Sequence, residues 1–469
     1  MMRIHILYLT LLLLSAPSYG QSVQRMTLSF DNFIEKVKKN HPIAKQAALK
    51  LEYGDAYLLK SRGMFDPKAF SEVSQKYFNE KQYYSTTNSG LKIPTWFGLE
   101  LGGGYEQNQG LYLNPQNNNP NAGLWYAGVS VPIGQGLFID ERRAALKKAQ
   151  IYVKSTQAEQ QAIYNELIYD AGKFYWYWFN SYNTLNVYEE ALELAQQRFN
   201  AVKQGALLGD VPLIDTVEAG IQVQNRWLSY QEAELNFKNA SAMLSVYLWD
   251  EGIIPLEVAE GTTPMAINEV KTQTITGNMI LQLDSIQQQH PDLVYYQYKI
   301  DQLEVDKKLK QEMIKPQLNL KYNAITQPVG DDVFAQYNVN NYQWGVAFSM
   351  PLFIRKQRGE LRLANLNISE TKLLYQTKLA TITYKAKASM NELETSFNQV
   401  NLYHQTVVDY ERLLNGEKQK FEAGESSLFM VNSREVGYIN TQLKLIELIA
   451  KNQTAKLATT YALGLLYNN

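Results

Sequence analysis

Hydrophobic positions follow a helical spacing over two long stretches of the chain. Within each stretch, apolar residues recur at alternating steps of three and four, the seam pattern of coiled coils. The first series is Leu185, Tyr188, Leu192, Ala195, Phe199 and Val202, and the second is Val400, Tyr403, Val407, Tyr410 and Leu414. As one helix, the stretch from Gln135 to Leu208 would be roughly 110 Å long, several times the diameter of an ordinary domain. The pattern therefore predicts a long coiled coil or one stave of a helical barrel.

The two stretches form an internal repeat with a constant offset of 215 residues. Arg143–Gly209 matches Arg358–Gly424 without an insertion or a deletion. After each glycine the helical pattern breaks, near 209–212 and near 424–427, and then resumes. A glycine followed by polar residues or proline ends one helix and permits the next to begin. We therefore predict that each arm turns at a tip and comes back, and that one structural unit is used twice.

Strand patterns precede each long helix. Apolar and polar residues alternate within 316–352 of the second repeat, and the strand region of the first repeat, 65–133, ends in a matching segment. The apolar positions are Leu318, Leu320, Tyr322 and Ala324, then Tyr342, Trp344, Val346, Phe348, Met350 and Leu352, and in the first repeat Trp125, Ala127, Val129, Val131 and Ile133. A half-buried sheet of a water-soluble protein would show this alternation. An aromatic-rich apolar face opposite a Gly/Asn/Ser/Gln face fits a membrane barrel at least equally well.

The strand region of the first repeat has 34 residues more than that of the second. Phe97, Leu99, Leu101 and Tyr105 alternate there with glycine and glutamate. We predict an added β-hairpin, because a segment that joins helices on one side of a membrane must cross it an even number of times. The hairpin would belong either to a barrel wall, which we favour, or to a cap or plug. The Asn- and Pro-rich segment 114–121 is predicted to be an exposed loop.

The remaining segments complete the domain organisation. Each repeat opens with a helix, predicted at about Thr27–Arg62 and about Gln282–Lys315, and each of these helices contains a His-Pro pair. Residues 250–276 contain several Gly and Pro residues and have no periodicity. The predicted units are an export signal at 1–20, a first repeat at 21–249, a linker at 250–281 and a second repeat at 282–469.

The first twenty residues have the features of an export signal. Arg3 precedes an apolar core at Ile6–Leu14, and the small residues Ser18 and Gly20 follow it. A buried strand of the mature chain is the alternative interpretation. No later stretch approaches the roughly 18 apolar residues that a transmembrane helix needs. An exported chain of this kind is soluble in the periplasm, secreted, or inserted into a membrane as a β-barrel.

Composition narrows the classes of function. The chain has 45 Lys+Arg and 46 Asp+Glu, so a net charge of −1 gives no basic field for nucleic acid. The absence of cysteine excludes disulfides, thiolate metal sites and cysteine nucleophiles. The four histidines have no metal-ligand spacing, and no Walker, Rossmann or zinc pattern is present. We therefore expect no enzymatic activity, no cofactor and no metal site.

Together these features resemble the TolC family of outer-membrane efflux proteins over essentially the whole mature chain. The specific segments are Asn40-His41-Pro42 in an opening helix, Val131-Pro132 and Met350-Pro351 followed by Arg143 and Arg358, and Phe421-Glu422-Ala423-Gly424. The resemblance implies a mainly α fold with a transmembrane β-barrel part. It is a trimeric α-helical barrel continuous with an outer-membrane β-barrel and built from two tandem repeats. Three chains with four or six strands each would give twelve or eighteen strands, and we favour eighteen.

The resemblance also implies a gate at the periplasmic tip. Asp215 matches the acidic position of the family's polar links, whereas Phe421 and Ser426 replace the tyrosine and arginine partners. We therefore expect closure to depend on apolar contact by Phe421 and Leu428. Asp210, Asp215 and Glu425 should make this end of the molecule acidic. Asp215 could equally be a solvated carboxylate, since acids are favoured in the first turn of a helix.

The predicted function is that of an outer-membrane channel in a tripartite efflux or type I secretion system. Such a channel would pass substrates from an inner-membrane pump and a periplasmic adaptor to the outside. The expected partners are two further copies of the chain, the adaptor, the pump and outer-membrane lipid, but not nucleic acid. The alternative is an exported periplasmic coiled-coil protein with a structural or interaction role.

Overall fold

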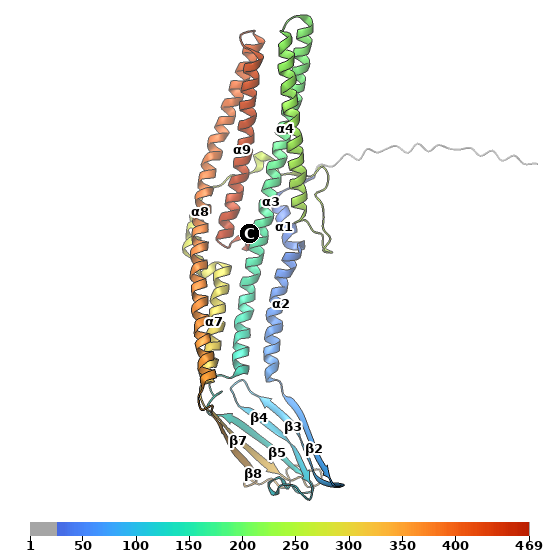
Figure 1. The fold of residues 1–469 in the computed structure, drawn as a ribbon, viewed down its shortest axis with the longest axis vertical. Helices are drawn as coiled ribbons and strands as arrows, with labels where there is room; N and C mark the ends of the chain where they lie inside the picture. Colours follow the sequence, from blue (N-terminus) through green and yellow to red (C-terminus); the bar gives the residue numbers. More distant parts are fainter. Residues whose placement is uncertain (1–25, 469) are drawn as a thin grey trace, which may run out of the picture.

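The structure, a computed structural model, describes residues 26–468, and the predicted export signal at residues 1–20 lies outside them. The molecule is a long rod of helices with one sheet at its end (Figure 1). The helices are α1 (Phe30–Asn40), α2 (Pro42–Arg62), α3 (Glu141–Leu208), α4 (Leu213–Ser245), α5 (Gly277–Asp284), α6 (Ile286–Gln289), α7 (Pro291–Glu312), α8 (Arg355–Glu422) and α9 (Leu428–Ala462). Short 3-10 helices lie at Gly63–Phe65, Pro115–Asn117, Ile267–Glu269 and Leu466–Asn468.

Two helices of 68 residues each, α3 and α8, run most of the length of the rod. At about 1.5 Å per residue each is roughly 100 Å long. Two shorter helices lie end to end beside each long one: α2 and α4 beside α3, and α7 and α9 beside α8 (Figure 1). Because α3 also packs against α7 and α9, the lateral order is α2/α4, α3, α7/α9 and α8. The two repeats thus form one layer, with α2/α4 at one edge and α8 at the other.

The predicted opening helices are wrong in one respect, because each is interrupted at its His-Pro pair. His41 and His290 adopt extended backbone conformations, and a new helix begins at the proline that follows. Proline disfavours the helical conformation in the residue before it but is well suited to the first position of a helix. The segment before α1 also differs from the prediction, since Thr27–Leu28 forms strand β1.

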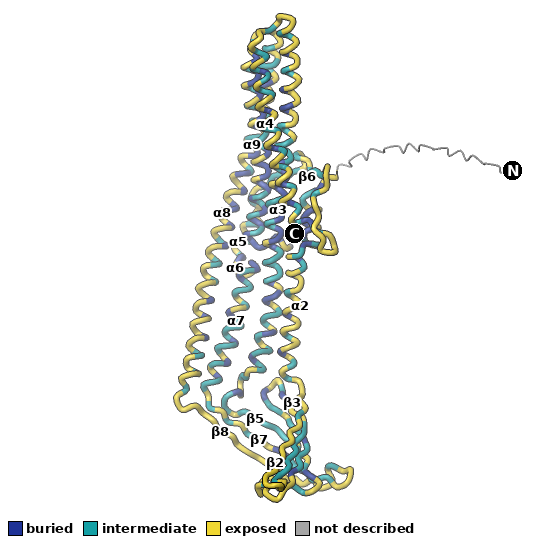
Figure 2. The backbone as a smooth tube through the Cα atoms, turned by 45° about the vertical axis from the view of Figure 1, so that its right-hand side comes forward, coloured by how far each residue is buried: buried dark blue, intermediate teal, exposed yellow. Residues whose placement is uncertain are grey.

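Strand β1 pairs in parallel with β6 (Thr263–Pro264), which lies in the segment that joins the repeats. This pairing places the linker against the middle of the rod, where buried residues are most frequent (Figure 2). The aromatic run in α3 supplies the core there, since Tyr175, Trp178 and Phe179 are fully buried and pack with Phe33 of α1. The Tyr175 hydroxyl donates a hydrogen bond of 2.8 Å to the Leu28 carbonyl. The aromatic run is therefore a helix–helix contact.

Six antiparallel strands form the sheet at the end of the rod, in the order β2-β3-β4-β5-β7-β8. They are β2 (Lys68–Phe78), β3 (Lys81–Pro94), β4 (Glu100–Gln109), β5 (Leu124–Pro132), β7 (Gln317–Thr326) and β8 (Tyr342–Ser349). Strands β2 and β5 occupy the positions in the first repeat that β7 and β8 occupy in the second, so β3 and β4 are the additional hairpin. Phe97 and Leu99 were predicted in a strand, but residues 96–98 form a turn with Gly98 at a φ of 97°.

Candidate functional site

The sheet has one apolar and one polar face, which the strand register assigns residue by residue. Residues directly opposite each other on neighbouring strands share a face. Val129 of β5 lies opposite Tyr322 of β7, which lies opposite Trp344 of β8. The apolar face continues through Tyr105, Leu101, Trp125, Ala127, Val131, Leu318, Leu320, Val346 and Phe348. The alternation predicted from the sequence thus defines two continuous surfaces.

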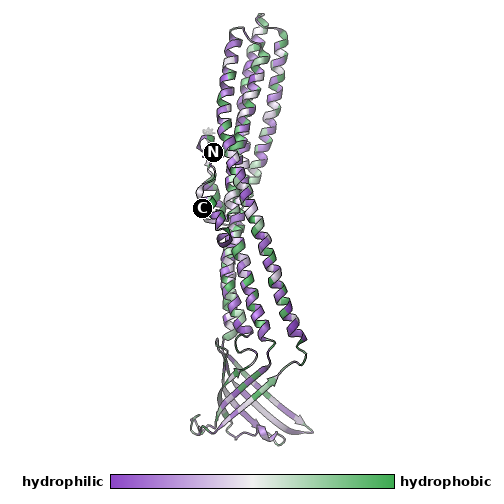
Figure 3. Ribbon diagram, turned by 90° about the vertical axis from the view of Figure 1, so that its left-hand side faces the viewer, coloured by the Kyte–Doolittle hydropathy of each residue, from purple (hydrophilic) through white to green (hydrophobic). Residues whose placement is uncertain are grey.

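Large side chains of the apolar face are exposed in the single chain. Trp344 is 62% exposed and Phe348 is 67% exposed. An apolar surface spread over several strands requires a covering of lipid or protein. The opposite, polar face contains Lys68, Glu72, Asn88, Lys92, Glu100, Ser130, Asn319, Lys321, Asn323 and Gln343. Figure 3 shows the resulting mixture of hydrophobic and hydrophilic positions along each strand.

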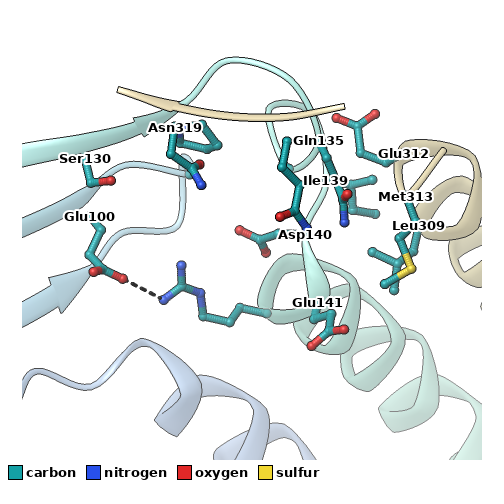
Figure 4. A pocket seen from close by; sticks show the side chains of 15 residues that line it. Glu100, Ser130, Gln135, Ile139, Asp140, Glu141, Leu309, Glu312, Met313 and Asn319 are labelled. Carbon is teal, nitrogen blue, oxygen red and sulfur yellow. Dashed lines mark hydrogen bonds and ion pairs between the residues drawn. The ribbon is translucent and has the colours of Figure 1, made fainter. Parts of the chain in front are cut away.

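The sheet meets the helices around a pocket of about 400 Å³ (Figure 4). Glu100 of β4 faces α3 across this pocket, where Arg142 Nη1 lies 3.5 Å from its carboxylate. Arg143 binds the connecting loop, since its guanidinium donates to the carbonyl oxygens of Gly136 and Leu137. These contacts tie the first turn of α3 to the sheet.

Glu312 forms the other side of this junction. Its side chain at the end of α7 is buried, accepts a hydrogen bond of 2.6 Å from Lys315 Nζ and accepts one of 3.2 Å from the Phe138 backbone N–H. Burial alone would raise the pKa of Glu312, but the hydrogen bonds from Lys315 and Phe138 outweigh it and keep the pKa below its usual value. Glu312 therefore stays ionised and joins the two repeats where the helices enter the sheet.

The opposite end of the rod has two tips, one from each repeat. Helix α3 ends at Gly209, whose φ is 84°, and α8 is followed by Gly424, whose φ is 75°. Both values favour glycine, which explains the residue type at each turn. Asp210 and Glu425 are exposed at these turns, and Asp215 is partly exposed in the first turn of α4. Across the part of the chain that the structure describes, the Asp215 carboxylate accepts no hydrogen bond.

Phe421 and Leu428 do come together, but within one chain. Leu428 is buried and Phe421 partly buried in a cluster with Val202 of α3 and Ala219 of α4. The cluster joins the helical hairpin α3–α4 to the hairpin α8–α9 close to the tips. Ser426 donates a hydrogen bond of 2.5 Å to Glu417 within its own hairpin. Glu417 also lies 3.6 Å from Arg434 Nε.

Sequence reasoning missed a second connection between the hairpins, which we call the polar tie. Arg198 of α3 forms two hydrogen bonds, of 2.7 and 2.8 Å, with the Glu435 carboxylate of α9. It also donates to the Asn432 side-chain oxygen at 3.0 Å, and Asn432 Nδ2 donates to Glu218 of α4 at 2.9 Å. One signal was available, because Arg198 and Glu435 stand where the other repeat has Leu413 and Gly220.

His41 and His290 are helix caps. In each case Nδ1 accepts a hydrogen bond of 3.2 Å from the backbone N–H two residues on, in Ile43 and Asp292 respectively. Burial lowers the pKa of both, and the pKa of His290 falls to about 4. Within residues 26–468 there is no group of three or more His, Cys, Asp or Glu side chains placed to hold a metal ion. No helix of this part of the chain has the length and apolarity needed to cross a membrane.

Residues 283–465 match the family model described as outer membrane efflux protein. No protein of curated function matches the sequence. The fold is that of solved outer-membrane channels. The CmeC channel of Campylobacter jejuni is 17% identical with a TM-score of 0.64, and the match covers 93% of this chain and 85% of that one. The MtrE channel of Neisseria gonorrhoeae is 12% identical with a TM-score of 0.65, and the match covers 93% of this chain and 88% of that one. The outer membrane protein VceC of Vibrio cholerae is 14% identical with a TM-score of 0.62, and the match covers 93% of this chain and 96% of that one.

Proposed function

We propose that the protein is the outer-membrane channel of a tripartite efflux or type I secretion system, since residues 283–465 match the outer membrane efflux protein model. The observation that supports this most directly is the two-faced sheet at the end of a helical rod. The apolar face meets outer-membrane lipid, and the polar face lines the route of the cargo. The helices extend this route through the periplasm towards an adaptor and an inner-membrane pump, which supply the energy.

The free edges of the helical layer support a trimer. Helix α4 packs on α3 through Ala219, Ala233 and Ala240, which lie seven or fourteen residues apart. On the side of α4 away from this seam, an apolar stripe is 49–69% exposed in the single chain; it consists of Ile214, Val217, Ile221, Leu228 and Leu235. At the opposite edge, α8 exposes Leu363, Leu366, Leu373, Tyr384, Leu402 and Leu413. Packing α8 of one copy on α2 and α4 of the next covers both stripes, and three copies close a ring.

The sheet supports the same stoichiometry. Strands β2 and β8 are its edges, and an unpaired strand edge is not tolerated in lipid. Pairing β8 of one copy with β2 of the next closes a barrel of eighteen strands for three copies. The additional hairpin β3–β4 is then part of the wall, since β3 pairs with β2 and β4 pairs with β5.

The gate, in this proposal, is at the acidic tips. Phe421 and Leu428 keep the two hairpins of each chain together by apolar contact, and the polar tie reinforces them. Asp210, Asp215 and Glu425 are present three times around the axis of the trimer, which favours the entry of cations. Movement of α8–α9 away from α3–α4 opens the tunnel when the adaptor binds.

Fractionation and conductance test the proposed function. We expect the mature protein in the outer membrane as a detergent-extracted trimer that resists dissociation on heating and that forms channels in planar lipid bilayers. Recovery in the soluble periplasmic fraction as a coiled-coil protein without channel activity would contradict the proposal. Twelve rather than eighteen wall strands in a structure of the trimer would restrict β3–β4 to a cap or plug.

A further inference from the structure

Three lysines lie on the polar face of the sheet near its junction with the helices, two of them on the neighbouring strands β2 and β3 and the third on β7. Lys68 of β2 lies directly opposite Lys92 of β3, and Lys321 of β7 lies opposite Ser130 of β5. Like charges directly opposite each other destabilise a strand pair. None of the three forms an ion pair with a carboxylate of residues 26–468, so their charges are not neutralised within the chain.

Two of these lysines line a recess in the sheet, which we call the lysine recess. Its volume is about 150 Å³, and it is lined by Lys92, Lys321, Phe70, Glu100, Tyr126, Ser130 and Asn323, with Gly102 and Gly128 among the backbone positions. Glycine leaves room there because it has no side chain. A cavity of about 150 Å³ holds one benzene-sized group, so the recess suits one functional group of a cargo molecule.

Hydrogen-bonding groups in the lysine recess remain available to a ligand. The Asn323 residue is 5% exposed, and its amide forms no hydrogen bond within the described chain. Glu100 is the one acid that lines the recess, and Arg142 lies 3.5 Å from its carboxylate. The Lys92 ammonium lies 4.8 Å from the centre of the Phe70 ring, which holds it at the edge of the recess.

We propose that the lysine recess binds a carboxylate or phosphate group of a cargo molecule. The inference rests on the proposed function, because the polar face of the sheet must line the channel. The Lys321 ammonium, the Asn323 amide and the Ser130 hydroxyl line the recess as donors for one anion, and the Lys92 ammonium adds positive charge at its edge. Charge-assisted hydrogen bonds are among the stronger ones in proteins. A trimer has three such recesses where the helical tunnel enters the barrel. The basic ring lies at the opposite end of the tunnel from the acidic tips.

Current block in planar bilayers tests this inference on the full-length trimer. Benzoate and inorganic phosphate serve as probes, added at constant ionic strength. The test variant is the double substitution Lys92→Gln and Lys321→Gln. The matched control is Lys76→Gln, because Lys76 is on the same face but lies opposite Tyr84, towards the far end of the sheet. We expect at least a tenfold higher probe concentration for half-block in the double variant, and a weaker increase in Asn323→Ala.

The outcomes separate this inference from the proposed function. Equal block in the wild type, the double variant and the Lys76→Gln control would overturn the lysine recess as an anion site and leave the channel intact. Absence of any channel would overturn the proposed function and this inference with it. Weaker block by benzoate or by phosphate in the double variant but not in the Lys76→Gln control would support the site. A shift of the KCl reversal potential towards cation selectivity in that variant would be the independent second readout.

Discussion

The histidines of the two His-Pro pairs have the same structural role in both repeats. His41 and His290 each precede proline, each end one helix and each cap the next through Nδ1. A ring nitrogen can accept a hydrogen bond only while it is unprotonated, so the cap depends on neutral histidine. The sequence shows the His-Pro pairs at equivalent positions, which favoured a structural role. It does not show the burial that sets their pKa.

The low pKa of His290 predicts a loss of stability in acid. The pKa is about 4 in the folded protein against 6.5 for the free group, so the unfolded chain binds more protons between these values. The stabilisation that depends on neutral His290 is therefore fully present above pH 6.5. It is lost as the pH is lowered towards 4, which reduces the free energy of unfolding by about 3 kcal/mol in total. Denaturation midpoints at pH 7.5 and pH 5 measure this loss.

His290→Asn should reduce this pH dependence, because asparagine also caps a helix but does not titrate. His290→Ala should lower stability at pH 7.5 by about 1 kcal/mol through the lost cap, and should show the same reduced pH dependence because alanine does not titrate. His404→Asn, at an exposed position of α8, is the matched control and should behave as the wild type. An unchanged pH dependence in His290→Asn would show that another group dominates the acid response.

At the scale of elements, periodicity identified most of the strands and the long helices, because one face of each is apolar. Both long helices end where the glycines predicted. The strand pair β2–β3 was not identified, since Lys68–Phe78 has polar residues on both faces. The opening helices were predicted too long because their apolar spacing continues across His-Pro, where backbone geometry overrides the pattern. The polar tie could not be deduced, since it joins residues more than 200 positions apart.

Adjacent substitutions on β8 should have opposite effects if one face of the sheet meets lipid. Val346 lies opposite Leu320 on the apolar face, and Ala347 lies opposite Asn319 on the polar face. Val346→Arg should cost roughly 2–4 kcal/mol near the middle of the bilayer and reduce the yield of trimer in the outer membrane. Ala347→Arg should assemble normally and change conductance. Equal losses of trimer in the two variants would argue against a lipid-facing surface.

The apolar stripe on α4 predicts which substitution separates the subunits. Leu228 is 57% exposed in the single chain and would be covered by α8 of the next copy. Leu228→Glu would place a carboxylate in that interface, where burying an unpaired charge is costly, so the trimer should dissociate at a lower temperature. Asn236→Glu, an exposed position beside the stripe, is the control. Gel migration of unheated and heated samples distinguishes trimer from monomer in each variant. Equal dissociation temperatures for Leu228→Glu and Asn236→Glu would place the interface elsewhere.

At the scale of the whole molecule, the architecture of the rod and the sheet follows from the duplication of one structural unit. Two copies of one unit form one layer with exposed apolar residues at each free edge, and in the proposed trimer these edges meet without a further domain. The function then depends on how the copies differ. The first repeat has the additional strands β3 and β4, and the polar tie joins side chains that do not occur at equivalent positions. The sequence could show these differences but not which of them would meet in space.

The polar tie predicts how the tips open. Arg198 and Glu435 have side chains 18% and 5% exposed, so loss of one partner leaves the other buried without its counterpart. Removal of one member of such a pair typically costs about 3–5 kcal/mol, enough to favour separation of the hairpins α3–α4 and α8–α9. Arg198→Ala should therefore raise single-channel conductance in planar bilayers and sensitise cells to large antibiotics.

Phe421→Ala should increase the conductance further by weakening the apolar cluster between the same hairpins. Arg412→Ala, which removes an exposed arginine of α8, is the control. Intact Arg198→Ala trimers with wild-type conductance would show that the tie stabilises the helices without holding the tunnel closed.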